Sequence, residues 1–330
     1  MGDQWNPGQW AEFEAALRRE ARSARGEEDA WRRIARAALR IMARYSTSFY
    51  IVSRFLPPHK RERVEVIYAS VRYPDEVVDT FDISAAERVR RLDAWSEDYE
   101  RALRMTDFCS AIAEGVTPVL AGFARVVRES RIPPEHYRAF LAAMRMDVFP
   151  RPFETMDDLI GSYIYGSATV VGYFLTHVYG PAQPDGLEQA LAGARELAIA
   201  LQLTNFIRDV REDRRRGRVY LPQDLLRAAG ADMDRLEDPA NRRRVIGVIR
   251  RVAAHAEEAY RRAEEAVDDF APDSRVAIRA CIDVYRTLNR RVSASDDCVV
   301  RRESVSLWHK FLALPACKYW HLPLYAVRLR

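Results

Sequence analysis

The chain has 330 residues, of which 48% are hydrophobic and 30% charged, so it is long enough to bury a substantial core. Glycine is scarce at 14 residues, while alanine, leucine, arginine and glutamate are abundant, which favours helices over strands. The 52 lysines and arginines exceed the 48 aspartates and glutamates by only four, a balance too small to indicate a nucleic-acid-binding protein.

Apolar residues recur at helical spacing along most of the chain, and strand-like alternation is hard to find. Proline, serine and threonine at helix-starting positions divide this pattern into successive helices. The predicted helices cover residues 29–43, the segment from Pro58 through Val71, a stretch capped by Ser84, and residues 134–148, 155–179, 187–214, about 240–268 and 274–294. No repeat or long linker is visible, so we expect one all-α domain over residues 1–330, with its core at about 29–303 and peripheral ends.

The first of two acidic clusters is Asp75-Glu76-Val77-Val78-Asp79. In a helix, Asp75 and Asp79 stack on one face one turn apart, and Asp82 continues that face. Stacked like charges destabilise a helix unless a cation sits between them, and such oxygen ligands suit Mg²⁺ bound to substrate phosphate. For this cluster alone, a solvated acidic surface is the alternative. Arg72, one turn earlier, would either stabilise the helix or contact a diphosphate.

The second cluster belongs to a polar stripe on one long helix, Gln202, Asn205, Asp209 and Asp213. The stripe starts inside an apolar stretch, where buried polar groups need partners that metal, water and phosphate would supply. The basic loop that follows, residues 214–218, could fold over an anionic ligand, or its arginines could complement the dipole at the helix C-terminus. Two such ladders of aspartates facing each other across a cavity would hold a magnesium–diphosphate cluster.

A run of small and aromatic residues, Tyr163 to Gly172, lies in the middle of a predicted helix. On an α-helix, Tyr163, Ser167 and Val171 share one face, which would form a smooth wall beside a prenyl chain. The mid-helix glycines also favour the alternative of tight helix–helix packing.

Segments spread over residues 46–302 match, in order, the motifs of one known family. The strongest match runs from Ala200 through Asp213 to Pro222. The others are residues 48–50 (Ser-Phe-Tyr), 67–69 with Arg72 and the first acidic cluster, 146–148 (Met-Asp-Val), and 163–172. On these motifs the chain resembles the squalene/phytoene synthase family of head-to-head prenyl synthases, and bacterial phytoene synthases in particular.

The resemblance implies an isoprenoid synthase fold, with helices around a central hydrophobic channel. It also implies a catalytic set that holds Mg²⁺, or Mn²⁺ in its place, between two prenyl diphosphates. That set comprises Asp75, Asp79, Asn205, Asp209 and Asp213 as metal ligands, with Gln202 beside the reacting centre. The implied substrate-binding residues are Ser48, Phe49, Tyr68, Arg72, Tyr163, Ala168, Val171, Arg208, Arg218, Tyr220 and Tyr285.

Two departures from the family pattern lie close to the first cluster. Tyr45 stands where a histidine often precedes the Ser-Phe-Tyr segment, and Tyr73-Pro74 replaces the usual pair before Asp75. A proline at this position could begin the helix or kink it at the metal site. It removes no metal ligand.

The predicted activity is Mg²⁺-dependent head-to-head condensation of two geranylgeranyl diphosphates to phytoene, through a cyclopropylcarbinyl diphosphate. One alternative is a C30 synthase that makes squalene, dehydrosqualene or presqualene diphosphate from farnesyl diphosphate, with NADPH required only for the reductive squalene step. Another is a non-catalytic scaffold relative, although such relatives lose aspartates that this chain keeps. A terpene cyclase is a smaller third alternative.

The remaining expectations concern location and partners. The N-terminus has no signal-peptide pattern, and no stretch approaches about 18 uncharged apolar residues, so we expect a cytoplasmic protein without a transmembrane helix. Residues 308–330 alternate apolar and basic side chains, which would touch the inner membrane face peripherally or dock on the core. The expected partners are prenyl diphosphates and no nucleic acid, and the oligomeric state is left open.

Overall fold

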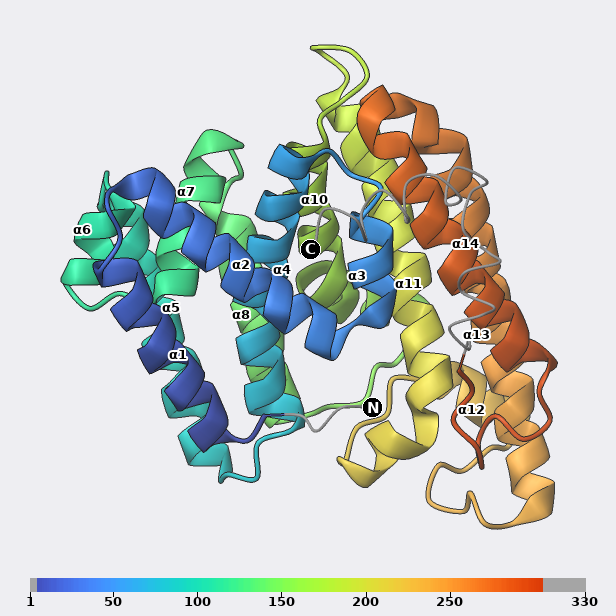
Figure 1. Ribbon diagram of the computed structural model, residues 1–330. Helices are drawn as coiled ribbons and strands as arrows, with labels where there is room; N and C mark the ends of the chain where they lie inside the picture. Colours follow the sequence, from blue (N-terminus) through green and yellow to red (C-terminus); the bar gives the residue numbers. More distant parts are fainter. Residues whose placement is uncertain (1–4, 305–330) are drawn as a thin grey trace. The chain divides into compact units, whose positions relative to one another are not determined.

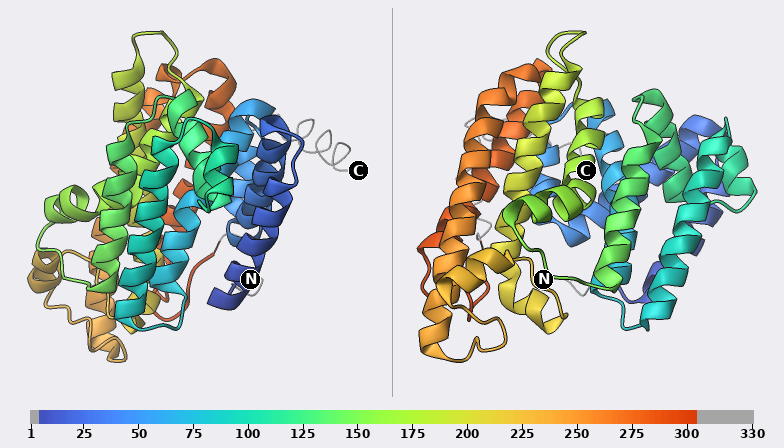
Figure 2. Two further views of the ribbon diagram at one scale, coloured as in Figure 1. Left: turned by 90° about the vertical axis from the view of Figure 1, so that its left-hand side faces the viewer. Right: turned by 180° about the vertical axis from the view of Figure 1, so that it is seen from behind.

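The computed structural model describes residues 5–304, and this part of the chain is built from helices (Figures 1 and 2). Extended pairing among the described residues is limited to one isolated antiparallel bridge between Pro181 and Phe270. The all-α prediction is therefore confirmed. The chain divides into two compact units, residues 1–149 and 150–330, which are taken in turn. That they form one domain stays a prediction.

The first unit is organised around α4, which contacts α2, α5, α7 and α8. Val66, Ile67 and Ala69 of α4 are completely buried in that core. The helices of this unit are α1 (Pro7–Arg22), α2 (Glu27–Tyr45), α3 (Thr47–Ser53), α4 (Pro58–Asp79), α5 (Ala85–Arg104), α6 (Phe108–Ala113), α7 (Pro118–Glu129) and α8 (Pro134–Val148). The helices predicted over 29–43 and 134–148 and from Pro58 correspond to α2, α8 and α4.

Local signals explain where these helices start. The Ser84 hydroxyl accepts a hydrogen bond from the Glu87 amide at 3.2 Å, which confirms Ser84 as the cap of α5. Proline opens α4, α7 and α8, where its missing N–H costs nothing. A capping box between Asn6 and Gln9 starts α1, a helix that the sequence pattern did not predict.

The second unit is organised around α11, which packs against α10, α13 and α14; Figure 1 shows α11, α13 and α14 side by side. A Cβ at Gly172 would lie 3.2 Å from the Ala194 carbonyl oxygen, and one at Gly193 would lie 2.5 Å from the Ala266 Cβ, so both glycines permit close approach. The helices of this unit are α9 (Met156–Asp158), η1 (Leu159–Thr169), α10 (Val170–Tyr179), α11 (Leu187–Arg215), α12 (Gln223–Ala229), α13 (Pro239–Glu265), η2 (Ala266–Asp269) and α14 (Pro272–Ala294).

The helix predicted over residues 155–179 differs from the expectation in its first half. Thr155 caps its start, but residues 159–169 form the π-helix η1 before α10 begins. That Tyr163, Ser167 and Val171 form one wall beside a prenyl chain stays a prediction. The close approach at Gly172 agrees with the tight-packing alternative.

No helix within residues 5–304 is both long enough and apolar enough to cross a membrane. The basic and apolar segment 308–330 lies outside the described residues.

Candidate metal and diphosphate site

The first aspartate ladder, Asp75 and Asp79, lies on the last turns of α4. Arg72 forms an ion pair with Asp75 at 2.5 Å and another with the completely buried Glu76. Burial raises the pKa of Glu76 to about 7, against the lowering effect of Arg72. Burial by itself would lower the pKa of Arg72, but the acidic neighbours, Asp75 first, outweigh it and raise that pKa. In the structure Arg72 thus pairs within α4, with one partner a buried carboxyl group, and its contact with a diphosphate stays a prediction.

One expectation for this cluster is wrong. Asp82 was predicted to continue the face of Asp75 and Asp79, but α4 ends at Asp79 with Thr80 as its C-cap. The Thr80 and Phe81 amides both bond the Glu76 carbonyl oxygen at 3.0 Å, which turns the chain out of the helix. Asp82 lies beyond that turn and is exposed. The ladder in this unit consists of two aspartates.

Pro74 neither begins α4 nor ends it, because the helix runs from Pro58 to Asp79. A proline inside a helix removes one backbone hydrogen bond and typically costs about 3 kcal/mol. The carbonyl oxygen left without a helical donor is that of Ser70, and it accepts a hydrogen bond from the Tyr137 hydroxyl at 2.6 Å. Trp95 in turn donates its indole N–H to the Tyr137 oxygen at 2.8 Å. Side chains of α5 and α8 therefore support the helix just before the ladder.

The two tyrosines among these departures, Tyr45 and Tyr73, pack against side chains of α1 and α5. The Arg72 guanidinium lies 4.5 Å from the centre of the Tyr45 ring, a cation–π contact. The Trp10 ring lies 6.0 Å from that of Tyr45 and 5.4 Å from that of Tyr73. Tyr73 stacks on Trp95 at 4.4 Å. An aromatic cluster thus surrounds the base of the first ladder.

Further toward the N-terminus, the structure brings two predicted substrate-binding rings together. Phe49 of α3 and Tyr68 of α4 have ring centres 6.1 Å apart. Ser46 fixes the start of α3, since its hydroxyl accepts from the Phe49 amide at 3.2 Å. Ser48 is half-buried on the same short helix.

The second ladder, Asp209 and Asp213, lies on α11, and two arginines meet its first carboxylate. The Arg208 Nε is 2.8 Å and the Arg302 Nε is 2.6 Å from Asp209 Oδ1, and Arg302 also lies 3.4 Å from Glu212. Burial alone would raise the pKa of Asp209, but the hydrogen bonds and charges of Arg208 and Arg302 outweigh it and hold that pKa below its usual value.

Tyr285 of α14 and the predicted arginine Arg208 lie near each other. Burial would lower the pKa of Arg208, but Asp209, Tyr285 and Asp213 together raise it. Arg302, which follows α14, was missed because no spacing in the sequence links it to a helix 93 residues earlier.

The loop after α11 returns to the end of the ladder. The Arg218 amide donates to the Asp213 carbonyl oxygen at 2.9 Å, and both side chains are buried. Arg214 instead pairs with Asp234, and Arg216 with Glu212 at 3.3 Å. Of Arg214, Arg216 and Arg218, only Arg218 is buried beside the ladder.

An aromatic cluster stands next to this loop. The Tyr163 and Tyr220 hydroxyls are 3.1 Å apart, and Tyr220 stacks on Phe206 at 4.1 Å. Phe153 stacks on Tyr220 at 6.2 Å. Tyr163 and Tyr220 were predicted from the sequence, whereas Phe153 and Phe206 were missed. Of the other predicted residues, Gln202 and Asn205 are half-buried on α11, Ala168 is half-buried on η1 and Val171 on α10.

The donor set suits a hard divalent cation. Within the described residues no three side chains of His, Cys, Asp or Glu gather as a metal cluster, and each ladder by itself has two aspartates. Asn205, Asp209 and Asp213 offer only oxygen ligands, spaced at successive helical turns. Asp209 is already neutralised by two guanidinium groups, which shows that positive charge is stabilised there. These residues fit Mg²⁺.

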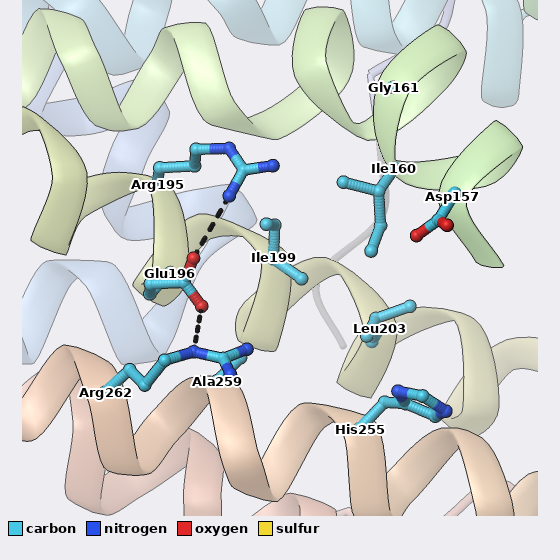
Figure 3. A pocket seen from close by; sticks show the side chains of 10 residues that line it. All are labelled: Asp157, Ile160, Gly161, Arg195, Glu196, Ile199, Leu203, His255, Ala259 and Arg262. Carbon is cyan, nitrogen blue, oxygen red and sulfur yellow. Dashed lines mark hydrogen bonds and ion pairs between the residues drawn. The ribbon is translucent and has the colours of Figure 1, made fainter.

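A separate pocket of about 270 Å³ lies in the second unit between η1, α11 and α13 (Figure 3). Glu196 lines this pocket and accepts hydrogen bonds from two other lining residues, Arg195 at 3.1 Å and Arg262 at 2.7 Å. Its volume is below the roughly 300–1,000 Å³ usual for ligand pockets. None of the predicted site residues lines it.

The all-helical arrangement is that of the isoprenoid synthase fold, which the solved squalene and dehydrosqualene synthases share. More specifically, the sequence model of the squalene/phytoene synthase family matches residues 42–309, so the chain belongs to this family, whose members are prenyltransferase enzymes.

The relatives include phytoene synthase 3 of Zea mays, 32% identical over 279 residues that cover 82% of this chain and 62% of that protein. The phytoene synthase of Arthrospira platensis is 30% identical over 286 residues, covering 83% of this chain and 89% of that one. The chain therefore spans less than two thirds of the maize relative. A solved dehydrosqualene synthase has the same fold, with a TM-score of 0.74 at 22% identity, covering 89% of this chain and 98% of that one.

Proposed function

We propose that this protein joins two geranylgeranyl diphosphates head to head to form phytoene. The observation that carries the proposal is made on α11. Its polar stripe runs from Gln202 to Asp213, and two arginines form ion pairs with Asp209 in that stripe. The similarity to proteins named phytoene synthase, from Zea mays and Arthrospira platensis, supports phytoene as the product.

Mg²⁺ held by Asp75, Asp79, Asn205, Asp209 and Asp213 would neutralise the diphosphate groups and make them better leaving groups. The family resemblance implies a hydrophobic channel for the prenyl chains.

The arginines of the chain bind and orient the leaving group. Arg208 and Arg302 now bond a carboxylate, and the same guanidinium geometry suits phosphate oxygens. Arg72 and Arg218 take the corresponding role beside the first ladder and in the loop after α11. Holding the diphosphate in this way lets its C–O bond break to leave an allylic cation.

Aromatic side chains protect and guide the cation. Tyr163, Phe206 and Tyr220 present ring faces that stabilise positive charge and keep out water, which would quench it. Phe49 and Tyr68 do the same in the first unit.

The double bond of the second substrate attacks the cation. The resulting cationic adduct loses a proton as the three-membered ring closes, giving a cyclopropylcarbinyl diphosphate. Loss of its diphosphate, rearrangement and a final deprotonation give the C40 hydrocarbon. The balance is two C20 diphosphates to one phytoene, two diphosphate ions and two protons.

Incubation of the purified protein with Mg²⁺ and either farnesyl or geranylgeranyl diphosphate, with and without NADPH, tests the proposal. We expect phytoene from the C20 substrate, independent of NADPH, and its loss in Asp209→Asn. Glu188→Gln, an exposed acid in the first turn of the same helix, is the matched control and should retain activity. A C30 product in preference to C40 would replace the C20 assignment, and no product from either substrate would favour a scaffold.

A further inference from the structure

The helix that carries the first ladder has a missing hydrogen bond immediately before Asp75. Pro74 has no N–H, so the carbonyl oxygen of Ser70, four residues earlier, loses its helical donor, and the proline ring crowds the same oxygen. α4 ends at Asp79, only five positions after Pro74. The turn that bears both aspartates therefore has a weakened junction at its base.

The Tyr137 hydroxyl takes the place of the missing donor. It donates to the Ser70 carbonyl oxygen at 2.6 Å, and Trp95 donates to the same phenol oxygen at 2.8 Å, which fixes the direction of the O–H. Tyr137 and Ser70 are completely buried, so solvent does not compete at this position. Burial raises the pKa of Tyr137, so its hydroxyl stays protonated and remains a donor.

We propose that Tyr137 is a positioning residue for Asp75 and Asp79, and that its hydroxyl substitutes for the backbone donor that Pro74 lacks. A buried carbonyl without a donor is costly, and the helix could relieve that cost only by opening the junction below the ladder. The Trp95–Tyr137–Ser70 chain of hydrogen bonds joins α5 and α8 to that junction. The inference rests on the proposed role of the two aspartates as metal ligands.

A double-mutant cycle with Pro74 tests this pairing. Tyr137→Phe removes the O–H and keeps the ring, whereas Pro74→Ala restores a backbone N–H to the Ser70 carbonyl. Tyr99→Phe is the matched control. Tyr99 is also completely buried, stacks at 4.6 Å from Tyr137 and bonds a backbone carbonyl, that of Pro134 at 3.4 Å, away from α4.

The first readout is hydrogen exchange of the ligand-free protein. In Tyr137→Phe we expect the amides of residues 71–73 and 75–79 to exchange at least about fivefold faster, because the junction opens more often. Tyr99→Phe should leave that segment unchanged. In the Pro74→Ala background, Tyr137→Phe should cause less than about a twofold change, since the alanine N–H already serves the Ser70 carbonyl.

The second readout is binding of Mn²⁺ with inorganic pyrophosphate, followed by electron paramagnetic resonance. Tyr137→Phe should weaken it about tenfold and Pro74→Ala should rescue the loss, whereas a purely packing role would give the same loss in both backgrounds. Equal effects in the two backgrounds, or faster exchange in Tyr99→Phe, would overturn the proposal. If Tyr137→Phe does not fold, the double variant with Pro74→Ala should; failure of both also overturns it.

The outcomes separate this inference from the proposed function. A wild-type protein that makes no prenyl product contradicts the function, but the exchange cycle still decides whether Tyr137 supports the junction. Conversely, an active protein whose exchange shows no coupling between Pro74 and Tyr137 contradicts only the positioning role.

Discussion

The two aspartate ladders share one spacing but are supported in different ways. In α4 the helix contains Pro74, and donors from α5 and α8 support the turn before Asp75. In α11 the helix is continuous over 29 residues, and Arg208 meets Asp209 from the adjacent position. The helix under the first ladder therefore depends on donors from other helices, whereas the helix under the second is unbroken, although Asp209 also pairs with the distant Arg302.

This difference explains why the second motif is more evident in the sequence. A site built by one continuous helix keeps its spacing in the chain, so the residue order is also the spatial order. A site completed by other helices has partners at large sequence separations, such as the 67 residues between Ser70 and Tyr137. The first ladder is correspondingly more open to damage from distant substitutions.

The largest expected effect comes from removing one carboxylate of each ladder. Asp75→Asn and Asp209→Asn should each lower phytoene formation at least about 100-fold, because each weakens the charge stabilisation of the leaving group. Steady-state product assays with circular dichroism as the folding check would measure this. Asp82→Asn should stay near wild type, because Asp82 lies beyond the end of α4. Full activity in either ladder variant would mean that the two ladders are not equivalent in function.

A second prediction compares the arginines beside the ladders. Arg72→Gln leaves the buried Glu76 carboxyl without its cation, which should lower the free energy of unfolding by about 2–3 kcal/mol. The loss stays below that of a fully buried pair because Glu76, with a pKa of about 7, can take up a proton instead. Arg302→Gln should cost less than about 1 kcal/mol, since 43% of that side chain is exposed.

Urea unfolding measures both arginine variants, and Arg72→Gln with Glu76→Gln should recover most of the stability lost in the single variant. Equal losses for Arg72→Gln and Arg302→Gln would contradict the view that the first ladder is anchored by a buried pair and the second by a surface one.

The smallest expected effect is a pH dependence at the start of η1. Hydrogen bonds from Arg151 and the Glu154 amide hold the pKa of Asp158 below its ordinary value of 3.8. The carboxylate thus favours folding above pH 3.8, and this contribution is lost as the pH falls toward the lower folded-state pKa. Asp158→Asn should be slightly less stable than wild type at pH 6, and the difference should shrink by pH 3. A difference that is constant with pH would contradict this role.

Most of the helices could be predicted because their apolar residues recur with the α-helical period. The segment predicted over 187–214 is α11, Leu187–Arg215, and the one over 274–294 is α14, Pro272–Ala294. The π-helix at residues 159–169 could not be predicted, because the spacing of apolar residues does not show whether backbone hydrogen bonds span i to i+4 or i to i+5. The short helices α3 and α6 were missed for lack of a full period.

The candidate site could be predicted wherever one segment supplies it. Gln202 through Asp213 needed only helical geometry, and the loop to Tyr220 follows directly. Arg302 reaches Asp209 across 93 residues, and no local pattern announces such a contact. The hydrogen bond from Tyr137 could not be predicted either, because it joins residues 67 positions apart, and Pro74 indicated only a helix start or a kink at that position.

Gly193 sets how closely α11 packs at a point far from the second ladder. The missing side chain lets the helix lie against Ala266, where even a methyl group would have to push it aside. At 1.5 Å per residue, Asp213 lies about 30 Å along α11 from Gly193. A tilt of the helix axis by about 5° at Gly193 would therefore move Asp213 by about 2.6 Å. Metal coordination tolerates only about 0.2 Å. The position of Asp209 and Asp213 thus depends on helix packing at Gly193, a residue with no chemical role of its own.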